Sequence, residues 1–104
     1  MVLRGSVVKI PAKNVTLKQL ADELGYELKY SRNYDYFKMK YEGYFYSGKS
    51  FYRIIVYKKE LQFVVFCHVN IYKATAQHMI TEQNGILIVM EEIIKMAINK
   101  LINK

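Results

Sequence analysis

The clearest periodic pattern in this chain is an alternation of apolar and polar residues between positions 36 and 45. A period of two is typical of a β-strand that buries one of its faces. Residues 51–58 are rich in the aromatic and β-branched residues that strands favour. Between these two segments, residues 47–50 (SGKS) have the composition of a turn. The pattern therefore predicts a β-hairpin with a four-residue loop at positions 47–50.

Such a loop would place Tyr46 opposite Phe51, and this register determines which side chains share a face of the hairpin. The buried face would hold Phe37, Met39, Tyr41, Phe45, Tyr52, Ile54 and Val56. The opposite face would combine aromatic rings with cations: Tyr36, Lys38, Lys40, Tyr44, Tyr46, Phe51, Arg53, Tyr57 and Lys59. The first set is suited to a core, and the second predicts an exposed surface.

The N-terminal segment predicts a short strand over residues 2–10, ended by Pro11, and a helix over 16–24 that Thr16 caps. Residues 15–26 (VTLKQLADELGY) resemble the first helix and turn of a helix-turn-helix motif. The resemblance ends at Ser31, where the second helix of that motif needs an aliphatic residue. We therefore interpret this segment as an ordinary amphipathic helix. The alternative would make residues 27–37 a recognition helix for the DNA groove.

Residues 61–69 (LQFVVFCHV) are apolar on both faces, which predicts a strand in the interior of a sheet. Further helices are predicted at about 72–83 and about 87–103. Asn84-Gly85 separates them, and because this dipeptide also favours hairpins, a hairpin within 72–90 is the alternative. The whole pattern predicts an α+β fold in a single domain, residues 1–104. It would have a small antiparallel sheet of about four strands, with the helices packed on one face.

A net charge of +7 and a pI near 9.5 favour acidic partners such as nucleic acid. Residues 26–59 hold eight Lys or Arg against three Asp or Glu, together with nine of the ten tyrosines. The alternative interpretation is a basic surface that serves only solubility. Abundant Lys, Ile, Asn and Tyr, with no Trp and one Pro, is typical of AT-rich genomes such as those of many viruses and mobile elements.

The single Cys67 excludes an intramolecular disulfide, which favours a reducing compartment. The N-terminus lacks the apolar stretch of a signal peptide. The longest apolar runs, residues 63–67 and 86–90, are too short to span a bilayer. We therefore expect a soluble cytoplasmic protein, in the host cell if the source is a virus, without a membrane partner.

Residues 43–50 (GYFYSGKS) match the phosphate-binding pattern G-x-x-x-x-G-K-[ST]. That pattern functions where a buried strand leads into a glycine-rich loop and a helix follows the lysine. Here bulky residues fill the variable positions, and the residues after Ser50 favour a strand. The apolar run 86–92, which ends in two glutamates, resembles the metal-binding strand of such proteins. The hairpin is the preferred interpretation, and P-loop nucleotide binding is the remote alternative.

Candidate catalytic and metal-binding residues are few. Cys67, His68 and His78 are the only soft metal ligands, too few for a closed zinc site. Cys67 and His68 are adjacent on a predicted strand and would point to opposite faces, so they cannot form a nucleophile pair or share one ion. The acidic pairs 22–23 and 91–92 are helix neighbours rather than facing carboxylates. We therefore predict no catalytic residues, metal or cofactor.

The function that the pattern favours is non-catalytic nucleic-acid binding, with a single strand preferred over a duplex. Aromatic rings would stack on bases and cations would contact phosphates. The predicted binding residues are Tyr36, Lys38, Lys40, Tyr44, Tyr46, Lys49, Arg53, Tyr57 and Lys59. The alternative is a small protein-interaction module that binds an acidic protein surface, such as a mobile-element protein that blocks a host complex.

The C-terminal helix has a wider apolar stripe than one small sheet needs to cover it. This predicts a homodimer in which Ile94, Ile98 and Leu101 pack across a two-fold axis. The alternative is that the whole stripe covers the chain's own sheet.

Overall fold

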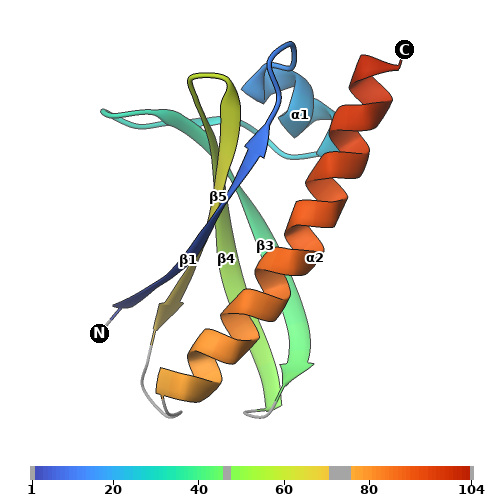
Figure 1. Cartoon of the computed structure of the whole chain (residues 1–104). Helices are drawn as coiled ribbons and strands as arrows, with labels where there is room; N and C mark the ends of the chain where they lie inside the picture. Colours follow the sequence, from blue (N-terminus) through green and yellow to red (C-terminus); the bar gives the residue numbers. More distant parts are fainter. Residues whose placement is uncertain (1, 46–47, 71–75, 104) are drawn as a thin grey trace.

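The computed structural model describes residues 2–45, 48–70 and 76–103, with side chains for 7–41, 52–67 and 83–103. Along the described chain the elements are β1 (Val2–Pro11), α1 (Leu17–Leu24), β2 (Lys29–Tyr30), β3 (Asp35–Phe45), β4 (Gly48–Lys59), β5 (Gln62–Asn70) and α2 (Ala76–Ile102). Figure 1 shows α2 lying along the sheet, with α1 beside its C-terminal end.

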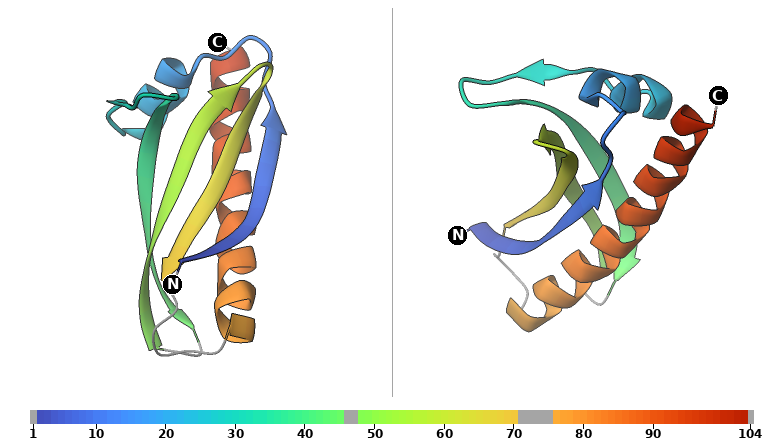
Figure 2. Two further views of the ribbon diagram at one scale, coloured as in Figure 1. Left: turned by 90° about the vertical axis from the view of Figure 1, so that its left-hand side faces the viewer. Right: turned by 45° about the horizontal axis from the view of Figure 1, so that its top comes forward.

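The strands form one antiparallel sheet in the order β1-β5-β4-β3-β2. This confirms the α+β class and the interior position of β5. The fifth strand is the two-residue β2, which is too short to give a periodic pattern in the sequence. The sheet curves around α2, so both helices lie on one face and the other face is left uncovered by the described helices (Figure 2).

The β3–β4 hairpin has a different register from the predicted one. Phe45 pairs with Gly48, whereas the predicted four-residue loop would have paired Phe45 with Tyr52. The two partners differ by four residues, and because side chains alternate with a period of two, an even shift preserves the faces. Strand β4 begins at Gly48, so residues 48–50 extend the strand instead of forming the loop. The predicted loop was wrong, and the predicted buried face was right for Phe37, Met39, Tyr52, Ile54 and Val56.

Helix α1 has the start and stop that its sequence predicts. The Thr16 hydroxyl accepts from the backbone N–H of Gln19, and the Gln19 side chain accepts from the backbone N–H of Thr16, which completes a capping box. Gly25 ends the helix with φ of 82°, a left-handed conformation that glycine adopts without strain. The second helix of a helix-turn-helix motif does not follow, because residues 29–30 and 35–45 are strands. That alternative was wrong.

Helix α2 is continuous through Asn84-Gly85, so the predicted break between two helices was wrong, as was the alternative hairpin. Residues 72–75 of the first predicted helix lie outside the described residues. A glycine inside a helix costs about 1 kcal/mol relative to alanine. The buried Ile86, Leu87 and Met90, just after the glycine, pack into the core and outweigh that cost.

The core fills the space between the concave face of the sheet and the two helices. It includes Leu20 and Ala21 of α1, residues from β3, β4 and β5, and the inward face of α2. Among the described side chains, Gln83 is the buried polar one, and its side-chain amide donates to the carbonyl of Cys67. Cys67 lies on β5 opposite the point where the β1 register shifts between Arg4 and Val7. Gln83 thus supplies a donor where the ladder is irregular.

Candidate functional site

The candidate site is the outer face of the sheet, defined as the face opposite both helices. Residues paired across antiparallel strands share a face. Tyr36 pairs with Tyr57, and Lys40 pairs with Arg53. The structure therefore brings six of the predicted binding residues together on this face: Tyr36, Lys38 and Lys40 from β3, and Arg53, Tyr57 and Lys59 from β4.

The other three predicted residues lie beyond what the structure describes in full. The backbones of Tyr44 and Lys49 pair with each other near the end of the hairpin, and their side chains are outside the described set. Tyr46 lies wholly outside the described residues. The site is therefore built on the six residues above.

Four aromatic side chains form a continuous cluster on the outer face. The ring centroids of Tyr34 and Tyr57 are 4.5 Å apart with the planes tilted by 31°. Tyr57 contacts Phe66 edge to face at 6.0 Å, and Tyr34 contacts Tyr36 in the same manner at 5.8 Å. These separations fall in the range of favourable aromatic pairs. The cluster joins the turn before β3 to β3, β4 and β5.

Two members of this aromatic cluster, Tyr34 and Phe66, were missed by the sequence analysis. Tyr34 precedes β3 and lies outside the 36–45 stretch that was used, although it has the same parity as Tyr36. Phe66 is on β5, whose interpretation as apolar on both faces did not assign its side chains to a face. Val64 is buried on the same outer face, between Tyr57 and Lys9 in neighbouring strands. Pairing β5 with β4 assigns alternate residues of 63–67 to the two faces, so the face of Phe66 was predictable once that strand pairing was known.

Cations surround the aromatic cluster. One row of cross-strand neighbours runs over all five strands as Lys9, Val64, Tyr57, Tyr36 and Lys29, with a lysine at each end. The cations whose side chains are described on the outer face are Lys9, Lys29, Lys38, Lys40, Arg53 and Lys59, and all but the half-buried Lys38 are exposed. Among the side chains described on this face, none is acidic; Glu42, which pairs with Phe51, shares the face by register, and its side chain is outside the described set. The face therefore attracts anions.

The described residues of the GYFYSGKS motif lie at the end of β3 and the start of β4. Gly43 pairs with Ser50, and Gly48 to Ser50 belong to strand β4. A phosphate-binding loop needs its lysine at the start of a helix, where backbone N–H groups converge on the phosphates. In the described residues, Lys49 lies in a strand instead. The local geometry does not fit a phosphate cradle.

This geometry gives a direct prediction for nucleotide binding. ATP with Mg²⁺ is expected to leave the melting temperature of the wild type unchanged, and Lys49→Ala is expected to fold normally. A ligand that binds only the native state raises the melting temperature, so thermal denaturation with and without ATP tests this. A rise of several degrees that disappears in Lys49→Ala would restore the nucleotide hypothesis.

The other candidate residues from the sequence are placed as follows. Cys67 is buried in the core, and burial raises the pKa of its thiol to about 12, so the thiol is protonated at neutral pH. The side chains of His68 and His78 are outside the described set. Among described residues, no group of three or more His, Cys, Asp or Glu could hold a metal ion.

Neither described helix is long and apolar enough to cross a membrane.

The predicted dimer residues of α2 are turned towards the chain's own sheet. Ile94 and Ile98 are buried in the core, and Leu101 packs against it. In the folded monomer, Ile94 and Ile98 are therefore not available to a second copy. Among the side chains of α2 that the structure describes, the exposed apolar ones are Ile88, Val89, Met96 and Ile102.

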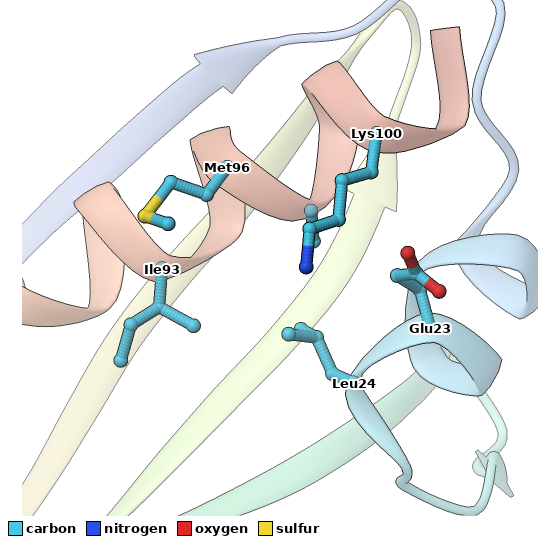
Figure 3. Close-up of a pocket in the computed structure, with 6 residues that line it drawn as sticks. Glu23, Leu24, Ile93, Met96 and Lys100 are labelled. Carbon is cyan, nitrogen blue, oxygen red and sulfur yellow. The ribbon is translucent and has the colours of Figure 1, made fainter. Parts of the chain in front are cut away.

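An open groove of about 280 Å³ lies between α1 and the C-terminal half of α2. Figure 3 shows its lining, with Glu23 and Leu24 from α1 facing Ile93, Met96 and Lys100 from α2. The groove lies on the helical side of the molecule, away from the outer face of the sheet. It places one acid and one lysine beside an apolar floor, without a cluster of reactive groups.

Comparison with protein-family models, curated proteins and solved structures gave no match to this chain. The site is therefore assessed on its own chemistry.

Proposed function

We propose that this protein is a non-catalytic nucleic-acid-binding module that uses the outer face of its sheet. The observation that carries the proposal is one surface on which an aromatic cluster is surrounded by six cations, with no acid among the side chains described there. Rings offer flat surfaces to bases, and lysine and arginine neutralise phosphates. We further propose an intracellular location and a viral or mobile-element source, both from composition.

The shape of the site supports this assignment. Both described helices pack on the concave side, so neither projects from the outer face as a major-groove reader would. A sheet that presents aromatic rings among cations is a known solution for binding single strands. Contacts of these two kinds carry little base information, so weak sequence preference is expected.

The same face could bind an acidic protein surface, because tyrosine and arginine are also favoured in protein interfaces. The two functions differ in what competes. If the ligand is nucleic acid, a free oligonucleotide would compete for the site, and it would compete better the more phosphates it has. The affinity for the nucleic acid would also fall steeply with salt concentration. The cation pattern, spread over the whole face around the rings, favours the extended polyanion.

The salt dependence of binding tests the proposed function. If Lys38, Lys40, Arg53 and Lys59 each neutralise a phosphate, log affinity against log salt concentration is expected to have a slope of roughly −3 for a single strand. Lys38→Ala is expected to weaken binding to all sequences alike and to make the slope shallower by about 0.7. Fluorescence anisotropy with a labelled oligonucleotide measures both.

Lys18→Ala is the matched control, since Lys18 is an exposed lysine on α1 that pairs with Asp22 at 3.4 Å. It removes the same charge from the opposite side of the molecule and is expected to leave the slope unchanged. Equal effects of Lys18→Ala and Lys38→Ala would mean that only net charge matters, and this would count against a site on the outer face. If Lys38→Ala lost binding to an acidic protein but kept binding to the oligonucleotide, the interaction-module function would be favoured.

A further inference from the structure

We propose that the outer face holds an unpaired base against the ring of Tyr34, so that its ligand is a single strand or an unpaired nucleotide within a longer strand. This inference rests on the proposed function and adds the residue that contacts the base. Tyr34 was not among the residues that the sequence pattern placed in the site.

Within the aromatic cluster, Tyr34 is the ring that a ligand in solvent can reach most easily. The rings of Tyr57 and Tyr34 are already in contact, with centroids 4.5 Å apart and planes tilted by 31°, so a base cannot enter between them. Phe66 packs against Tyr57 edge to face within the sheet. Tyr34 lies between Tyr57 and Tyr36 in the contact series Phe66, Tyr57, Tyr34, Tyr36, and at 37% it has the largest exposed fraction of the four rings. A base is therefore expected to extend the stack on the solvent side of Tyr34.

The turn between β2 and β3 fixes the position of this ring. The Ser31 hydroxyl donates to the Tyr34 carbonyl at 2.6 Å and accepts from the Tyr34 backbone N–H at 3.1 Å. The backbone N–H of Ser31 also donates to the same carbonyl at 3.2 Å. One serine side chain thus holds both backbone polar groups of Tyr34. Ser31 is therefore a positioning residue for the stack. Because it already restricts Tyr34, Tyr34 has less conformational freedom to lose when a base binds.

The ligand class follows from the geometry of stacking. In an intact duplex both faces of an internal base are covered by its neighbours, so a ring on a protein surface has no face to contact. An unpaired base leaves a face free. Lys29, which pairs with Tyr36 beside the cluster, and the cations on β3 and β4 then lie where the flanking phosphates would run.

The test compares Tyr34→Ala with Tyr30→Ala on two probes. Tyr30 is a neighbouring tyrosine that is 75% exposed, but it pairs with Asp35 and so lies on the opposite face from Lys29 and Tyr36. The probes are a thymidine oligonucleotide of about 12 nucleotides, within the site size of sheet binders, and an abasic strand of equal length. The abasic strand keeps the phosphates and removes the bases.

Tyr34→Ala is expected to weaken binding to the thymidine strand about 5- to 150-fold and to leave binding to the abasic strand unchanged. Tyr30→Ala is expected to change neither, and Tyr34→Phe is expected to keep wild-type affinity for both. Ser31→Ala is expected to lower affinity for the thymidine strand alone, and Ser31→Thr, which keeps the hydroxyl, to restore it. A wild-type preference for the thymidine strand over its duplex completes the expected pattern.

The inference is overturned if wild-type protein binds the thymidine strand while Tyr34→Ala and Tyr30→Ala have equal effects, or if duplex and single strand bind equally well. In those cases the nucleic-acid function stands and the stacking role fails. If the wild type binds neither probe more tightly than an unrelated protein of the same charge, the proposed function fails together with the inference.

Discussion

Ile98→Glu is expected to unfold this protein, because the side chain of Ile98 lies in the core and is only 5% exposed. A carboxylate at this position would lose its hydration without gaining a cation or donor, at a cost of several kcal/mol. Domains of this size are stable by only about 5–15 kcal/mol. Circular dichroism and thermal denaturation are expected to show lost or strongly reduced cooperative folding.

Met96→Glu provides the matched control, since Met96 is on the same helix two residues earlier and is 62% exposed. It is expected to keep the wild-type melting temperature to within a few degrees. The same pair of variants tests the homodimer. If α2 mediates self-association, the exposed Met96 and Ile88 are the accessible contacts, and light scattering should show dissociation in Met96→Glu. A well-folded, monomeric Ile98→Glu variant would show that Ile98 belongs to a dimer interface and would contradict its place in the core.

Lys58→Met is expected to lower the free energy of unfolding by about 2–4 kcal/mol, because hydrogen bonds from charged donors contribute more than neutral ones. The Lys58 ammonium donates to the carbonyls of Ala12 and Val15, which bracket the loop between β1 and α1. It also lies 5.1 Å from the centroid of the Phe63 ring. Methionine keeps much of the apolar stem but leaves both carbonyls without this donor.

Lys59→Met is the control for that variant, because the next residue along β4 is exposed and lies on the outer face. In a domain of this size, each kcal/mol shifts the melting temperature by roughly 4–8 °C. Lys58→Met should therefore melt well below both the wild type and Lys59→Met. Equal melting temperatures for the two variants would show that the contacts of Lys58 contribute nothing measurable. Lys59→Met should instead weaken oligonucleotide binding, which Lys58→Met should not.

Local patterns in the sequence predicted the parts of the fold that local forces control. Helix α1 begins at the capping box of Thr16 and ends at the left-handed Gly25. Both features depend on contacts within a few residues, so the helix was predictable without knowledge of the elements that pack against it. The alternation from 36 to 45 assigned faces correctly even though the loop was wrong, since faces depend on parity and the register moved by an even number. For this reason the sequence correctly predicted that six residues of the candidate site share one face.

Local patterns were enough to predict an α+β chain with a capped first helix and a hairpin of one apolar and one basic, aromatic face. The other features depend on packing between distant segments. Helix α2 crosses Asn84-Gly85 because packing of its apolar face exceeds the local cost of a glycine. Phe66, Lys9 and Lys29 join the site because strand order, which no local pattern encodes, places β5, β1 and β2 beside the hairpin. Tyr34 joins it from the turn before β3, through its ring contacts with Tyr57 and Tyr36. Contacts between residues far apart in sequence depend on which surfaces must be buried together, and a one-dimensional periodicity does not specify that pairing.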